Sequence, residues 1–157
     1  MPNKSLDKID CAILNALQQD GRLSNVTLAE RVGLSESACL RRVRLLEKDG
    51  VIERYAMLAS QAAAGRPGNV FIQITLEQQK REHLRAFEAA VAGVPEVMEC
   101  YLMSGEADYL LRVIVADAAD YERLHSELLT RLPGVARVHS GFALRTVIKK
   151  TELPFGV

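Results

Sequence analysis

The chain has 157 residues, of which 48% are hydrophobic and 25% charged, and its 20 basic residues balance its 20 acidic ones. This composition is typical of a globular protein with one ordinary domain or two small ones, and it argues against disorder. No run approaches the roughly 20 apolar residues of a membrane span, and the N-terminus lacks the apolar region of a signal peptide. We therefore expect a cytoplasmic protein.

The N-terminal third predicts two helices joined by a polar turn. Residues 6–20 carry apolar side chains at three- and four-residue spacing, with Asp7 as the expected N-cap. A second, shorter helix is expected over 25–32 after a Ser24 cap. Gly33 then supplies the left-handed backbone conformation that a sharp turn requires.

A third helix is expected to follow at once, capped by Ser35 and ended by the Asp-Gly pair at 49–50. Three helices with a tight glycine turn before the third form the order of a helix-turn-helix, in which the third helix enters the DNA major groove. The predicted DNA-binding residues are Ser35, Ser37, Arg41, Arg42 and Arg44. The alternative is that the arginines form only the solvated face of an amphipathic helix.

Cys39 lies beside these arginines and raises the question of a reactive thiol. Neighbouring cations lower a thiol pKa, whereas burial raises it. The helical spacing puts Cys39 on the inner stripe with Val43 and Leu46, so a small buried hydrophobe is the favoured interpretation. The three cysteines of the chain are odd in number and never form a C-x-x-C pair, which indicates neither a disulfide framework nor a thiolate zinc site.

The stretch "VIERYAML" at 51–58 predicts a short strand or wing, and "ASQAAAGRPGN" at 59–69 has the composition of a linker. We therefore expect a DNA-binding domain over 1–55, a linker over 56–69 and a second domain over 70–157.

The second domain has the predicted order β-α-β-β-α-β. The expected elements are strands at 70–76, 97–103, 109–115 and 135–148, with helices at 77–92 and 117–131. "VAGVPEV" and "LTRLPGV" each close a helix before a strand, which supports two similar halves. This order is that of the ferredoxin-like fold, an antiparallel sheet with both helices on one face. A second copy of the sheet is the expected cover for the other face.

The turn in "YLMSGEADYLL" at 101–111 suggests a ligand site. The Asp108 carboxylate can pair with an α-ammonium group, and turn N–H groups near Gly105 can hold an α-carboxylate. The alternative is an ordinary hairpin with a solvent-facing aspartate.

The sequence resembles the Lrp/AsnC family of leucine-responsive, or feast/famine, bacterial transcription regulators, and it is closer to the leucine-responsive branch. The resemblance covers nearly the whole chain and is carried by residues 6–52, by 99–115 and by 128–140. It implies an α+β chain with an N-terminal winged helix-turn-helix and a C-terminal ferredoxin-like domain of the RAM type. In the family, the second domain binds amino acids at the junction between dimers.

The resemblance places Gly105 and Asp108 at motif positions of that effector site, and it adds Tyr101, Met103 and Ser140 as candidates for the pocket lining. Two short segments depart from the family pattern. Relatives often carry Thr-x-Thr where this chain has 138–140 as Val-His-Ser, and the turn residues 106–107 differ from those of the leucine-responsive protein. Met103 and Val138 suggest an aliphatic or thioether ligand.

The expected function is sequence-specific regulation of transcription at pseudo-palindromic DNA sites, with salt-sensitive binding. The family implies dimers that assemble into an octamer, a nucleoid-associated location in the cytoplasm, and an amino-acid effector such as leucine, methionine or another aliphatic amino acid. No other cofactor and no metal are expected. The main alternative for a DNA-binding protein is an architectural role, wrapping DNA without sensing an effector.

An enzyme is not expected. The three histidines, His83, His125 and His139, do not stand at metal-binding spacing with carboxylates or thiols. The sequence contains no P-loop, G-x-G-x-x-G or G-x-S-x-G motif.

Overall fold

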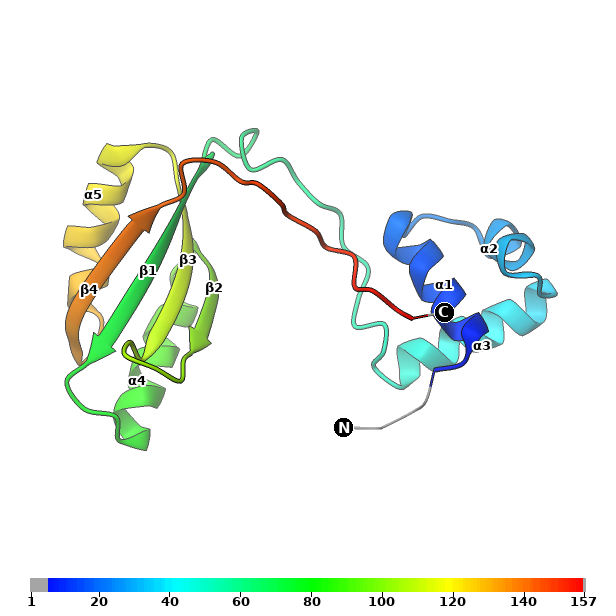
Figure 1. Cartoon of the computed structure of the whole chain (residues 1–157), viewed down its shortest axis with the longest axis horizontal. Helices are drawn as coiled ribbons and strands as arrows, with labels where there is room; N and C mark the ends of the chain where they lie inside the picture. The colour runs from blue at the N-terminus through cyan, green and yellow to red at the C-terminus, as the bar shows by residue number, and fades with distance from the viewer. Residues whose placement is uncertain (1–5, 157) are drawn as a thin grey trace. The chain divides into compact units, whose positions relative to one another are not determined.

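The computed structural model describes residues 6–156, which form two compact units (Figure 1). One unit contains residues up to Leu58 together with those from Val147 onward, and we call it the helical unit. The other, the sheet unit, contains Ala59–Thr146. No helix within the described residues is both long and apolar enough to cross a membrane.

The helical unit contains α1 (Lys8–Gln19), α2 (Asn25–Val32) and α3 (Glu36–Lys48). The predicted caps form in each helix. The side chains of Asp7, Ser24 and Ser35 accept hydrogen bonds from the backbone N–H groups three residues later. Gly33 ends α2 with φ 68°, the left-handed conformation expected of the turn. The predicted helix boundaries are therefore confirmed.

The core of the helical unit draws on all three helices. Its buried side chains are Ile13 and Leu14 from α1, Leu28 and Ala29 from α2, and Cys39 and Leu46 from α3. Partly buried Val43 completes the predicted inner stripe of α3. The close approach of α2 to α3 depends on the small Ala29, because a larger side chain at this 2% exposed position would separate the helices. Residues 51–58, all described, form no strand, so the predicted short strand is absent.

The sheet unit has the predicted ferredoxin-like order. Its elements are β1 (Gly68–Leu76), α4 (Arg81–Ala92), β2 (Val97–Leu102), β3 (Tyr109–Val115), α5 (Ala118–Glu127), a 3-10 turn (Leu129–Arg131) and β4 (Val135–Phe142). The strands are arranged β2-β3-β1-β4, and every neighbouring pair is antiparallel. Both helices cover the same face of the sheet (Figure 1).

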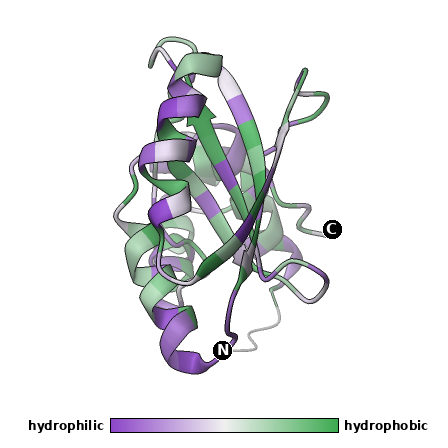
Figure 2. Ribbon diagram, turned by 90° about the vertical axis from the view of Figure 1, so that its left-hand side faces the viewer, coloured by the Kyte–Doolittle hydropathy of each residue, from purple (hydrophilic) through white to green (hydrophobic). Residues whose placement is uncertain are grey.

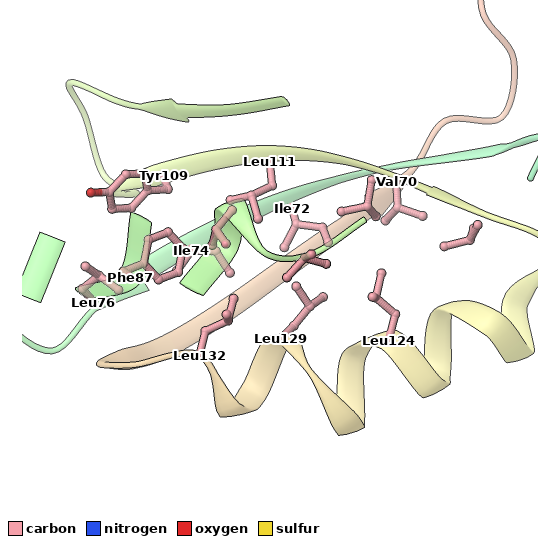
Figure 3. Close-up of a cluster of buried hydrophobic side chains, with 14 residues drawn as sticks. Val70, Ile72, Ile74, Leu76, Phe87, Tyr109, Leu111, Leu124, Leu129 and Leu132 are labelled. Carbon is pink, nitrogen blue, oxygen red and sulfur yellow. The ribbon is translucent and has the colours of Figure 1, made fainter. Parts of the chain in front are cut away.

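Alternation along β1 and β3 builds the core beneath those helices. Side chains 70, 72, 74 and 76 of β1 and 109, 111, 113 and 115 of β3 are buried against Phe87 and Val91 of α4 and against Leu124 and Leu129. Figure 3 shows Leu124, Leu129 and Leu132 directed toward the strands, and Tyr109 beside Phe87, with ring centroids 4.5 Å apart. Figure 2 shows hydrophobic residues along the strands, interrupted by hydrophilic ones, and hydrophilic residues on the helices.

The opposite face of the sheet stays uncovered in the single chain. Phe71 and Tyr101 are 43% and 53% exposed on this face. Leu110 and Ile114 of β3 are half-buried on the same face, opposite Gln73 and Asn69 of β1. Exposed aromatic and aliphatic side chains on one sheet face mark a surface that favours a partner.

The predicted linker at 56–69 is fixed to the sheet unit over its second half. The Arg66 guanidinium lies 3.2 Å from Asp120 and 3.4 Å from Glu96, and Gln61 donates a hydrogen bond to the Gly68 carbonyl. Residues 59–69 of the predicted linker therefore belong to the sheet unit.

The end of the chain differs from the expected domain of residues 70–157. Strand β4 ends at Phe142 and not at 148, and α4 begins at Arg81, four residues later than predicted. Residues from Val147 onward belong to the helical unit, because Phe155 packs against the core formed by the three helices. The compact sheet unit ends at Thr146.

Candidate functional site

The outward face of α3 carries three of the five predicted DNA-binding residues. Ser37, Arg41 and Arg44 are exposed on this face. Within residues 6–156, neither Arg41 nor Arg44 takes part in an ion pair, so both guanidinium groups are available to an anion. Ser35 caps the helix by accepting from the Ala38 N–H, which leaves it beside the helix N-terminus that favours phosphate.

Arg42 lies on a different side of α3 from these two arginines. Its Nη1 donates to an oxygen of Asp7 at 2.8 Å and to one of Asp10 at 2.7 Å, both at the start of α1. Asp10 is only 5% exposed, so the guanidinium neutralises a buried carboxylate. The Asp10 backbone N–H and the Arg42 guanidinium lower the pKa of Asp7 below its usual value. Arg42 therefore positions α3 against α1.

Replacing Arg42 by alanine is expected to lower the melting temperature of the chain by about 5 °C, because the buried Asp10 loses its cation. Replacing the exposed Arg41 by alanine is the matched control and should leave the melting temperature unchanged. Circular dichroism measures both. Equal melting temperatures for Arg42→Ala and the wild type would contradict a positioning role.

One contact between α2 and α3 was not expected from the sequence. The Asn25 side chain at the start of α2 donates a hydrogen bond of 2.9 Å to the Glu36 carbonyl in the first turn of α3. Together with the Leu34 N–H to Ala29 carbonyl bond of the turn, it fixes the angle between the two helices. The sequence did not predict this contact, because an asparagine next to a serine N-cap is typical of an ordinary helix start.

Cys39 is fully buried in the helical core, and burial raises the pKa of its thiol. A protonated, inaccessible thiol is a poor nucleophile, so the neighbouring arginines do not make Cys39 a reactive group.

A pocket of about 410 Å³ lies on the open face of the sheet unit, at the turn between β2 and β3. Its wall is the turn itself together with side chains of three strands. The lining residues are Gln73, Thr75, Met103, Ser104, Gly105, Glu106, Ala107, Tyr109, Leu110, Arg137 and His139. The pocket thus combines an apolar side with a guanidinium, an imidazole and a carboxylate.

Two of the predicted effector residues line this pocket, Met103 and Gly105. A Cβ placed on Gly105 would meet no atom within 4 Å, so the glycine leaves open space at the turn. Tyr101 lies on the same open face, paired with the lining residue Leu110, and its hydroxyl donates to Glu99.

The structure places Asp108 and Ser140 outside the pocket lining. Asp108 is 7% exposed, and its two carboxylate oxygens accept from the Leu76 N–H and from the Gln79 side chain, each at 2.7 Å. Ser140 lies on the helix-covered face, where it is hydrogen-bonded to the Tyr121 hydroxyl of α5. In the chain as described, both residues hold secondary-structure elements together beside the pocket.

Arg137 and His139 line the pocket and were missed as site residues. They pair with Thr75 and Gln73 of β1, so all four side chains lie on the open face. The alternation along β4 puts Val138 and Ser140 on the other face. The sequence contained that alternation, but the pairing with β1 was needed to assign the faces.

No group of three or more His, Cys, Asp or Glu side chains among residues 6–156 could hold a metal ion. A cationic helix face and a mixed polar and apolar pocket are two candidate sites of the described chain.

Both parts of the chain match known protein families. Residues 6–53 match the family described as winged helix-turn-helix DNA-binding, and residues 69–153 match the Lrp/AsnC ligand binding domain. The leucine-responsive regulatory protein of Salmonella typhimurium is 48% identical over 97% of this chain and 93% of its own length. The Bkd operon transcriptional regulator of Pseudomonas aeruginosa is 43% identical over 95% of this chain and 97% of its own length.

Solved structures are similar over the same extent. A transcriptional regulator from Neisseria meningitidis, solved as a complex with L-Met, has a TM-score of 0.90 at 37% identity and covers 96% of this chain and 97% of its own. An AsnC family transcriptional regulator from Agrobacterium tumefaciens has a TM-score of 0.90 at 38% identity, covering 95% and 97%. These relatives are regulators of transcription and not enzymes. The chain belongs to the Lrp/AsnC family of transcriptional regulators, with a helix-turn-helix for DNA and a separate ligand-binding domain.

Proposed function

We propose that the protein is a sequence-specific regulator whose DNA binding or assembly responds to a small amino acid held in the pocket on the sheet unit. One observation carries the proposal: the same chain contains a helix face with free guanidinium groups and a pocket lined by both a cation and a carboxylate. Such a pocket can bind both charged groups of an amino acid.

On the DNA side, Arg41 and Arg44 supply planar, bidentate donors suited to guanine edges and phosphates. Ser35 and Ser37 lie at the N-terminal end of α3, the end that meets the bases in a helix-turn-helix. Arg42 contributes by holding α3 against α1. In a symmetric dimer, two such helices would read a pseudo-palindromic site.

On the ligand side, the pocket matches the three parts of an aliphatic amino acid. The Arg137 guanidinium and the turn N–H groups near Gly105 suit the α-carboxylate, and Glu106 suits the α-ammonium group. Met103 and Leu110 suit an apolar side chain such as that of leucine or methionine. The L-Met complex of the Neisseria relative supports a ligand of this class.

Asp108 and Ser140 support the site from outside the lining. Asp108 ties the turn to the end of β1, and Ser140 ties β4 to α5. A ligand that moves the turn or β4 would strain these contacts, which gives both residues an indirect part in the response.

Assembly is part of the proposal. The open sheet face, with Phe71, Tyr101, Leu110 and Ile114, is the surface on which two copies would pair, and the pocket lies at the end of that face next to the turn between β2 and β3. Further association of dimers into an octamer would then place the pocket near a contact between copies. A ligand alters DNA binding only as far as it favours one assembly over another, typically by about 1 to 3 kcal/mol.

A thermal-shift panel of the common amino acids tests the proposal. We expect leucine, methionine or another aliphatic amino acid to raise the melting temperature, since a ligand at 100 times its Kd stabilises the native state by about 2.7 kcal/mol. Gly105→Leu is the control: its side chain would fill the open space at the turn and remove the shift.

Sedimentation and operator binding are then measured with each amino acid that shifts the melting temperature. If no amino acid changes the melting temperature, the sedimentation or the DNA affinity, the sensing function is wrong. An architectural role, wrapping DNA without an effector, would be favoured instead.

A further inference from the structure

The last described residues of the chain form specific hydrogen bonds with α1. Gln18 Nε2 donates to the Leu153 carbonyl at 3.0 Å, and Gln18 Oε1 accepts from the Leu153 N–H at 2.7 Å. One turn earlier on the same helix, Asn15 Nδ2 donates to the Phe155 carbonyl at 3.3 Å. Two side-chain amides of α1 therefore bind the backbone of the C-terminal segment.

The geometry has the features of a peptide-binding site. A carboxamide that donates to the carbonyl and accepts from the N–H of one residue satisfies both backbone groups, as a neighbouring strand would. Residues three apart on a helix share a face, so Asn15 and Gln18 present their amides to the same extended segment.

The segment itself is shaped for this contact. The Phe155 N–H donates to the Leu153 carbonyl, which closes a three-residue turn around Pro154. Proline fixes its own φ and so reduces the entropy lost when the turn forms. The turn directs Phe155 onto the core of the helical unit, where it packs with side chains of that unit.

The segment is connected to the pocket through residues 143–152 and β4. Strand β4 contributes Arg137 and His139 to the pocket lining and ends at Phe142, and the chain then continues to the docked residues. The helical unit is consequently joined to the sheet unit by two stretches of chain, one before β1 and one after β4.

We infer that the face of α1 formed by Asn15 and Gln18 is a binding site for residues 153–155 of the chain's own C-terminal segment, and that this docked segment transmits ligand occupancy from β4 to the DNA-binding unit. The docking rests on the contacts above. The transmission rests, in addition, on the proposed amino-acid response.

Hydrogen–deuterium exchange on the full chain tests the docking without DNA or ligand. The Leu153 amide is expected to be protected in the wild type and to exchange about tenfold faster in Gln18→Ala. Alanine is a good helix former, so α1 should remain folded in this variant. Gln78→Ala, at an exposed position of the sheet unit, is the matched control and should leave Leu153 unchanged. Unprotected Leu153 in the wild type would overturn the docking.

A second variant, Phe155→Ala, tests the packing separately from the amide contacts. Faster exchange at Leu153 is expected here as well, because the segment loses its apolar anchor. Unchanged exchange in both variants would overturn the assignment of this face as a binding site.

The transmission is tested by measuring operator affinity with and without methionine or leucine in the wild type, in Gln18→Ala and in Gln78→Ala. We expect Gln18→Ala to keep the thermal shift produced by the amino acid but to lose the change in DNA affinity. A full DNA response in Gln18→Ala would overturn the transmission. Absence of any thermal shift in the wild type would instead count against the proposed sensing function and would leave the exchange result standing.

Discussion

Replacing Arg41 and Arg44 together by alanine is expected to lower affinity for operator DNA by roughly a hundredfold or more. Each guanidinium that contacts a base edge contributes about 1 to 3 kcal/mol of binding free energy. Each phosphate contact that is lost lowers the slope of log affinity against log salt concentration by about one. Both side chains are exposed, so the fold should be unaffected. Fluorescence anisotropy across a salt series measures both quantities.

The matched control removes the same charge from the sheet unit. Arg81 and Arg85 are exposed on α4, and their double replacement by alanine should leave operator affinity close to that of the wild type. Equal losses in the two double variants would indicate a general charge effect. Unchanged affinity in the variant of α3 would exclude its outward face as the DNA surface.

Replacing Asp108 by alanine is expected to destabilise the sheet unit by about 2 kcal/mol. The change removes two hydrogen bonds to a carboxylate and leaves the N–H of Leu76, a residue only 5% exposed, without its partner. Denaturant unfolding measures the loss. Glu127→Ala, at an exposed position at the end of α5, is the control and should be neutral.

Asp108→Asn separates the two roles considered for this residue. An amide oxygen can still accept from the Leu76 N–H, and Gln79 can present its own oxygen to the new amide, so most of the stability should remain. If stability is retained and amino-acid binding is lost, the negative charge of Asp108 itself binds the α-ammonium group. If both are retained, Asp108 serves the fold of the turn.

The sequence predicted the three helices of the helical unit almost to the residue, because their boundaries are encoded locally. Asp7, Ser24 and Ser35 cap their helices through contacts within three residues, and Gly33 fixes the turn by its own backbone. The role of Arg42 was not predictable in the same way, since its partners lie 32 and 35 positions away. Helical spacing alone placed it beside the DNA-facing arginines.

The candidate pocket was predicted in part for a related reason. The turn at 103–108 stood out by its glycine and its flanking strands, whereas the contribution of β4 depends on how that strand pairs with β1. A shift of one residue in register exchanges the two faces of a strand, so the sequence could not tell whether Arg137 and His139 or Ser140 would face the pocket. The docked C-terminal segment has no periodic pattern, and its only sequence signal was a proline between two apolar residues.

The contribution of Phe155 to the helical core also limits how chimaeric proteins can be built from this regulator and its relatives. A chimaera that exchanges residues up to 58 alone would bring a foreign α1 to the native C-terminal segment, or the reverse. Because Asn15, Gln18 and residues 153–155 form one set of contacts, the two ends of the chain have to be transplanted together. The unit of exchange is thus discontinuous in sequence, although it is continuous in space.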